Sequence, residues 1–438
     1  MRQNEDAASR SFLPNLLLFV PSCEFFFLSQ RRGLEKKCAL LYKLKMSKTL
    51  SYVLVTPYTI AKSRTGGVLS RLLLRTDLEL VGAQIFAPDD SFVSEYSQRL
   101  RKLAPPDQPS LLADYIERNL APADDRPHRT LFLLFQGENA AEKLMAACGH
   151  IFPRDLELDV NDVSGETIRD TYADLIPSKD DPNEITYFEP AVLTPRNQKE
   201  ADEDMAIFAR FFDGRENMTI DAGLADAAKK ERTLVIIKPD NWVYNSSRPG
   251  AIMDMFSRTG LRVMGMKVHC FSLAQALDFY GPVEGVLKEK LSPMYGKKAQ
   301  ALLEKEFGFG LSEKTRQLLI ENFGPECAQN EFFSIVEFMT GKRPYNYPQE
   351  ELDKPGEVKC MILVYEGENA VSKIRDVLGP TDPLKAPEGT VRREFGSNIM
   401  VNTAHASDSV ESFEREKVIV RLNENTVCSI LKDYLGIS

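Results

Sequence analysis

Apolar and polar positions along the chain predict strands and helices in alternation. Residues 233–238 form an apolar run of strand length, and residues 261–271 alternate as a half-buried strand does. Residues 249–257 have helical spacing, and residues 273–280 begin another helix. The carboxy-terminal half therefore alternates strands with helices.

The same pattern occurs earlier, within residues 51–212. The segment S-Y-V-L-V-T-P-Y at 51–58 aligns with T-L-V-I-I-K-P-D at 233–240, and further matching segments follow in the same order. A repeat of such long period indicates duplicated domains rather than a solenoid.

We expect two tandem domains, at residues 46–212 and 232–438. Residues 213–231 between them are polar with small side chains, which predicts a linker carrying one short helix.

His405, one of only four histidines, is the main candidate for chemistry. Ala404 and Ala406 flank it and leave room for a bulky group. Glu416 follows eleven positions later, about three helical turns, so that it can face the imidazole. An imidazole with a carboxylate in reach is a nucleophile or a general base. The alternative is a loop histidine bonded to a nearby side chain.

Other residues of this half have the chemistry of a phosphate site. Lys238 ends an apolar strand, and Arg375, Thr381 and Arg392 follow in separate segments. Two arginines, a lysine and a hydroxyl that converge on one histidine would suit a polyphosphate.

Four motifs make residues 232 to about 420 resemble a nucleoside diphosphate kinase. They are I-I-K-P-D, G-P-T-D-P, G-T-V-R and N-T-A-H-A-S-D-S, in this order. The weaker resemblance extends back to Ser51. It implies an α+β fold with two tandem ferredoxin-like (βαββαβ) units, each a four-stranded antiparallel sheet with helices on one face.

The resemblance also implies roles for individual residues. In the family a histidine takes the phosphoryl group and a glutamate orients it, which implies His405 and Glu416. Phosphates and ribose are contacted by basic and polar residues that match Lys238, Arg375, Thr381, Arg392 and Asn402. A tyrosine that points at the site matches Tyr280, and the phenylalanine that stacks on the base matches Phe332 or Phe333.

The expected activity is transfer of the γ-phosphate of a nucleoside triphosphate to a nucleoside diphosphate. A histidine nucleophile splits this into two half-reactions with ping-pong kinetics, with His405, Glu416 and Lys238 as the catalytic residues. Magnesium would arrive with the nucleotide, and no protein metal site is expected. The alternative is a nucleotide-binding or scaffold protein with weak catalysis.

The first copy lacks this chemistry. Thr56 stands opposite Lys238, Met145 opposite Arg375, and Leu193 about opposite His405, while only Arg169 is kept, opposite Arg392. We expect this domain to be inactive, and to pack against the second domain or bind something else. The family assembles through its domains, which implies an internal pseudo-dimer and a possible homo-oligomer.

The second copy departs from the family in two insertions. Residues 281–331 contain two helical patterns, at 297–306 and 313–322, and residues 342–357 are rich in Pro, Tyr and Glu. Both flank the region where the family holds the base, so we expect a lid or a partner surface.

Composition narrows the class of protein. Of 438 residues, 27% are charged and 43% apolar, which is typical of soluble globular proteins. The net charge of −9 argues against a general nucleic-acid surface. Seven scattered cysteines without a C-x-x-C pair indicate reduced thiols and a cytoplasmic location.

Residues 1–45 differ from the rest of the chain. Their apolar stretch is too short for a membrane span and is interrupted by prolines, so no membrane segment is expected. It lacks the cleavage site of a signal peptide. Two interpretations stay open: a start assigned too early, with Met46 as the true first residue, or a genuine but poorly ordered extension.

Overall fold

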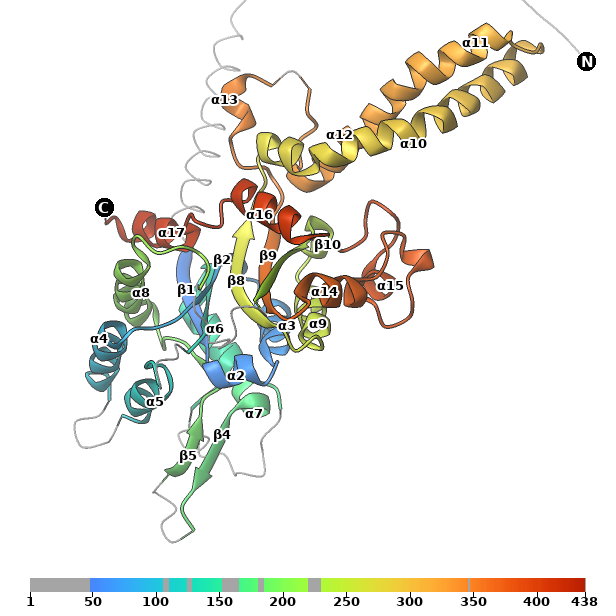
Figure 1. The fold of residues 1–438 in the computed structure, drawn as a ribbon. Coiled ribbons are helices and arrows are strands. Elements are labelled where there is room, and N and C mark those ends of the chain that lie inside the picture. Colours follow the sequence, from blue (N-terminus) through green and yellow to red (C-terminus); the bar gives the residue numbers. More distant parts are fainter. Residues whose placement is uncertain are drawn as a thin grey trace, which may run out of the picture. The chain divides into compact units, whose positions relative to one another are not determined.

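Two four-stranded antiparallel sheets organise the chain from Thr49 onward (Figure 1). The computed structural model describes residues 48–104, 110–123, 128–151, 165–179, 185–219, 230–345 and 347–437. The predictions for residues 1–45 lie outside these ranges. The α+β fold class is confirmed.

The first sheet has the strand order β2-β3-β1-β6. Its strands are β1 (Thr49–Val55), β2 (Glu79–Phe86), β3 (Thr130–Gly137) and β6 (Val192–Leu193). A separate two-stranded sheet pairs β4 (Asp174–Pro177) with β5 (Ile185–Glu189). The helices of this half are α2 (Pro57–Ala61), α3 (Thr65–Arg75), α4 (Asp90–Arg101), α5 (Leu111–Asn119), α6 (Ala140–Cys148), α7 (Ile168–Tyr172) and α8 (Gln198–Phe212).

The second sheet repeats that order as β8-β9-β7-β10. Its strands are β7 (Glu231–Ile237), β8 (Arg262–His269), β9 (Cys360–Gly367) and β10 (Ala404–Ala406). The helices are α9 (Arg248–Ser257), α10 (Leu273–Phe307), α11 (Glu313–Leu318), α12 (Gly324–Thr340), α13 (Gln349–Leu352), α14 (Ala370–Leu378), α15 (Val391–Phe395), α16 (Val410–Ile419) and α17 (Thr426–Leu435). The strands predicted at 233–238 and 261–271 and the helix predicted at 249–257 are confirmed as β7, β8 and α9.

Helices cover both faces of each sheet, so the prediction of one covered face is wrong. In β7, Val235 and Ile237 pack with α9 and α14. Leu234 and Ile236 point the other way and pack with α10, α12 and α16. A strand that is apolar at successive positions exposes apolar side chains on both sides, because alternate side chains face opposite ways. Both faces therefore need a cover.

The two halves share one core. Helix α3 packs on α9, and the edge strand β2 lies beside β8. At the helix contact Gly66 and Gly250 approach so closely that a Cβ on Gly66 would lie 2.2 Å from the Gly250 carbonyl oxygen. Helices and strands that correspond in the two halves therefore pack against each other.

The chain between and after the sheets also packs. Met218, within the predicted linker, bridges to Gly265 of β8, while residues 220–229 lie outside the described ranges. Helix α17 returns to the first sheet, where Val427 and Leu431 join the core around Leu50 and Tyr52. The last helix therefore stabilises the first half.

The first insertion is a helical arm. Helix α10 continues for 35 residues and packs along α12, so the helix predicted at 297–306 is only its last part. Pro282 and Pro293 lie inside α10, where proline usually ends a helix, but packing of α12 along it supports the continuation. The pattern at 313–322 forms α11 and a π-helical turn, Leu319–Phe323. Within the described ranges, no helix has the length and apolarity to cross a membrane.

Candidate functional site

His405 lies on the short edge strand β10, opposite Ile236 of β7. Its side chain is 24% exposed, so the ring is held but accessible. The ring of Phe279, on α10, meets it edge-on at 5.1 Å between centroids. A strand with only three residues and small neighbours therefore presents the imidazole at the sheet edge.

Glu416 fixes the orientation of this imidazole, and the predicted contact is confirmed. From α16, its Oε1 lies 2.9 Å from His405 Nε2. Its Oε2 accepts a hydrogen bond from the Ser407 hydroxyl at 2.7 Å, and the carboxylate is buried. A carboxylate oxygen is an acceptor, so Nε2 carries the proton and Nδ1 keeps its lone pair.

Lys238 follows β7 directly and is buried beside the histidine strand. Its Nζ donates to Asn402 Oδ1 at 2.7 Å, and its backbone N–H donates to the Thr403 carbonyl. Burial, together with the charge of Arg392, lowers the pKa of Lys238 to about 8. A buried ammonium next to another cation is poised to gain an anion.

Arg392, on α15, reaches the backbone of the histidine strand. Its Nη1 donates to the Gly379 carbonyl at 2.9 Å and its Nη2 to the Ala404 carbonyl at 3.1 Å. Burial and the neighbouring charge of Arg375 lower its pKa to about 10. The positive charge of Arg392 therefore lies one residue from His405.

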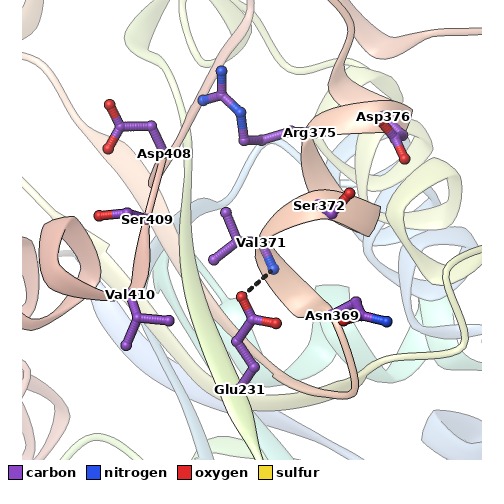
Figure 2. Close-up of a pocket in the computed structure, with 9 residues that line it drawn as sticks. All are labelled: Glu231, Asn369, Val371, Ser372, Arg375, Asp376, Asp408, Ser409 and Val410. Atoms are coloured by element: carbon purple, nitrogen blue, oxygen red, sulfur yellow. Dashed lines mark hydrogen bonds between the residues drawn. The ribbon is translucent and has the colours of Figure 1, made fainter.

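Arg375, on α14, is exposed and borders a cavity of about 520 Å³. Figure 2 shows Arg375 and Asp408 at the same end of this cavity. The Ser412 hydroxyl donates to Asp408 and keeps its pKa low, with Arg375 and His405 contributing. Arg375 thus lies between Asp408 and Arg392, next to the site but on its outer side.

Thr381 and Asn402 complete the group of predicted residues that the fold brings together. Thr381 is exposed, and its carbonyl accepts from Asn402 Nδ2 at 3.4 Å. The same amide donates to the Ile399 carbonyl at 2.7 Å. Asn402 therefore connects the loop that carries Thr381 with Lys238.

Tyr280 also lies at the site, with its ring centroid 6.4 Å from that of His405. Its hydroxyl is buried and has no hydrogen-bond partner among the described residues. Burial raises the pKa of this phenol well above its ordinary value, so it stays protonated. A protonated hydroxyl in this place can donate to an incoming oxygen.

The two phenylalanines predicted to stack on a base are placed elsewhere. Phe332 is 2% exposed and belongs to the core under the sheet, and Phe333 packs against Tyr345. Because its ring is buried in that core, Phe332 offers no face to a stacked base. Phe338, which the sequence motifs did not indicate, instead lies over Lys238, with Nζ 5.9 Å from the ring centroid. The sequence offers one signal for Phe338, which is that it follows Phe332 by six residues on the same helix.

The arrangement suits phosphoryl transfer. An oriented imidazole has a free Nδ1, and ammonium, guanidinium and phenol donors from four segments surround it. Such donors neutralise phosphate charge without further covalent chemistry from the protein.

Known proteins match this half of the chain. The family model of nucleoside diphosphate kinase matches residues 316–424. The nucleoside diphosphate kinase of Anaeromyxobacter sp. (strain Fw109-5) is 31% identical over 186 residues, which cover 42% of this chain and 86% of the relative. That of Paracoccus denitrificans (strain Pd 1222) is also 31% identical, over 42% of this chain and 89% of its own.

A solved structure, an NDP kinase from Pyrobaculum aerophilum, is 26% identical, covers 43% of this chain and 94% of its own, and has a TM-score of 0.30. That score is too low to add to the assignment, which rests on the sequence relatives. Because the match spans most of the length of relatives that are 31% identical, the chain belongs to the nucleoside diphosphate kinase family.

Proposed function

We propose that this chain is a nucleoside diphosphate kinase that works through a phosphohistidine at His405. The observation that carries the proposal is the contact of Nε2 with Glu416, which leaves Nδ1 as the nucleophile beside Lys238 and Arg392. A histidine held this way fits a covalent phosphoryl carrier better than a structural loop residue.

In the first half-reaction, Nδ1 attacks the γ-phosphorus of a nucleoside triphosphate. The bond from that phosphorus to the bridging oxygen breaks, and the nucleoside diphosphate leaves with the electron pair. In the second half-reaction, a terminal oxygen of another diphosphate attacks the phosphohistidine and releases Nδ1. Lys238, Arg392 and the Tyr280 hydroxyl would hold the transferred group, with Arg375, Thr381 and Asn402 around the rest of the nucleotide.

Magnesium would come with the nucleotide and would supply neutralisation of phosphate charge during the transfer. The residues around His405 fit this, because they are cations, amides and hydroxyls that bind phosphate.

Labelling tests the proposal. Incubation with ATP labelled at the γ-phosphate should give one labelled site per chain that is labile in acid and stable in alkali. The His405→Ala variant should take up no label, while His150→Ala, which changes an exposed histidine of the first half, should label as wild type does. An unlabelled wild type, or label that persists without His405, would reject the phosphohistidine.

We further propose that the chain arose by duplication, with domains at 46–212 and 232–438. Identical strand order supports this, as do matched left-handed residues: Asn139 and Asn369, at φ 53° and 54°, begin α6 and α14. Few non-glycine residues adopt this conformation, so its recurrence at equivalent places favours a common origin.

A further inference from the structure

We propose that Arg415 is a positioning residue, which replaces a hydrogen bond missing at Pro282 and so holds Phe279 and Tyr280 against His405. The proposal rests on His405 as the phosphoryl carrier. It concerns how the inserted helix is connected to the nucleophile.

Pro282 leaves a gap in the hydrogen bonds of α10. In an α-helix the N–H of residue 282 would donate to the carbonyl of Asp278, but proline has no N–H, and its ring pushes that carbonyl outward. Asp278 is exposed, so water can reach this carbonyl, but without its helical donor the oxygen also stays open to another donor of the protein.

Arg415 supplies that donor from α16. Its Nη1 donates to the Asp278 carbonyl at 3.1 Å, and its Nη2 donates to the Phe279 carbonyl at 3.2 Å. The guanidinium also lies over the Phe279 ring, 5.9 Å from its centroid. A planar group with two parallel donors suits two successive carbonyls, which a lysine could not match.

These contacts join Arg415 to residues that touch the nucleophile, His405. Arg415 precedes Glu416, whose carboxylate holds one side of the imidazole, and Arg415 itself holds the backbone of Phe279, whose ring meets the imidazole from another side. A second tie runs from Gln275 Nε2 to the Ile419 carbonyl at 2.8 Å. Helix α16 thus positions His405 twice, once directly and once through α10.

The missing hydrogen bond at Pro282 lies where the part of α10 at the site meets the inserted arm. Residues 273–280 of α10 reach the site, and beyond Pro282 the same helix continues as the inserted arm. A proline inside a helix is where bending occurs. Arg415 fixes the helix on the site side of that bend, so that movement of the arm does not displace Phe279 and Tyr280.

The test is a double-mutant cycle between Arg415 and Pro282. Arg415→Met should slow phosphorylation of His405 in a single turnover by about 10-fold or more, because small displacements of a reacting group are costly, with the nucleotide Kd changed less than about twofold. Arg415→Lys should recover part of that rate. Pro282→Ala restores the backbone N–H, so Arg415→Met in that background should lose little.

Lys417→Met is the matched control. Lys417 lies on the same helix, pairs with Glu414 at 2.5 Å and lies over the Phe413 ring, with Nζ 5.6 Å from the centroid. Both partners belong to α16 itself, so the same loss of charge should leave the rate unchanged. If wild type labels and Arg415→Met behaves as Lys417→Met does, or Pro282→Ala gives no rescue, the positioning role is wrong. If Arg415→Met does not fold, the same comparison is made with Arg415→Lys. Failure of wild type to label would instead reject the phosphohistidine.

Discussion

Strands β6 and β10 occupy the same edge of their two sheets, and they differ in the side chain that they present. Leu193 pairs with Leu54 in the first sheet, and His405 pairs with Ile236 in the second. The register is the same, so the predicted equivalence of Leu193 and His405 holds in three dimensions. The fold thus provides the same position in both halves, and the first half places an aliphatic side chain where the second places an imidazole.

Arg169 and Arg392 show what the two halves kept in common. Arg169 donates to the carbonyls of Gly149 and Val192, as Arg392 does to those of Gly379 and Ala404. The first half has no histidine at this edge, yet the arginine makes the same contacts there. We infer that this arginine stabilises the edge strand in both halves and serves phosphate only in the second.

The part of the first half that corresponds to Lys238 does not suit phosphate. Thr56 stands where Lys238 does, and its hydroxyl donates to Glu189 at 2.9 Å. Tyr115 also donates to this carboxylate, at 2.7 Å, and burial raises the pKa of Glu189. A buried acid that is already satisfied by hydroxyls neither attracts an anion nor leaves space for it. The first half therefore has a neutral hydroxyl and a buried acid where the second has a lysine, on a sheet with the same strand order.

The largest expected effect concerns the nucleophile. In the His405→Ala variant, adding Leu193→His should not restore labelling. A histidine at position 193 would lack a neighbouring lysine and would instead have a carboxylate nearby. Leu193→His alone should label as wild type does, which shows that the fold tolerates it. Acid-labile label on the double variant would overturn the comparison of the two edges.

The second largest expected effect concerns Lys238. Lys238→Met should lower kcat/KM by about 10²–10³, since it removes a buried cation from the transferred phosphate. Thr56→Val, the matching change in the first half, should leave kcat/KM unchanged and reduce the free energy of unfolding by about 1–3 kcal/mol, because Glu189 loses a donor. Steady-state kinetics and denaturant unfolding measure the two outcomes; equal kinetic effects would contradict the assignment.

The orienting carboxylate has a smaller effect. Glu416→Gln should slow His405 phosphorylation by about 10- to 100-fold, as loss of an orienting partner does at other sites. Asp204 holds the corresponding place on α8, where it accepts from the Tyr52 hydroxyl at 3.0 Å. Asp204→Asn should leave the labelling rate unchanged. A similar loss in both variants would mean that Glu416 acts through stability alone.

The sequence predicted what depends on short motifs. Strand β7, Lys238, His405 and Glu416 lie in short local patterns of strand, turn and helix, and neighbours in the chain largely fix their positions. The placement of Phe332 could not be predicted in this way, because it depends on how an inserted arm packs. A small shift of register on a helix turns a side chain to another face.

Long-range packing also limited what could be predicted from the sequence. That α17 returns to cover the first sheet, and that Arg415 serves the carbonyl of Asp278, depends on segments more than 130 residues apart. The motif sequence contains no signal for either. Proline usually ends a helix, and the donor that compensates Pro282 lies on another element, where the sequence gives no sign of it.

The smallest effect is on pH dependence. The pKa of Lys238 lies near 8, below the ordinary 10.5, so its ammonium is charged below that pH and loses its proton above it. From pH 7 to 9 the affinity for a nucleoside diphosphate should fall several-fold, and tenfold is about the maximum for a single titrating group. Lys238→Arg keeps its charge and should bind equally over this range, and Lys238→Met should be weak but flat. Calorimetric titration at fixed ionic strength separates these cases. If both variants keep the wild-type pH slope, the titrating group is not Lys238. The difference between Lys238 and Thr56 would then not explain the pH dependence.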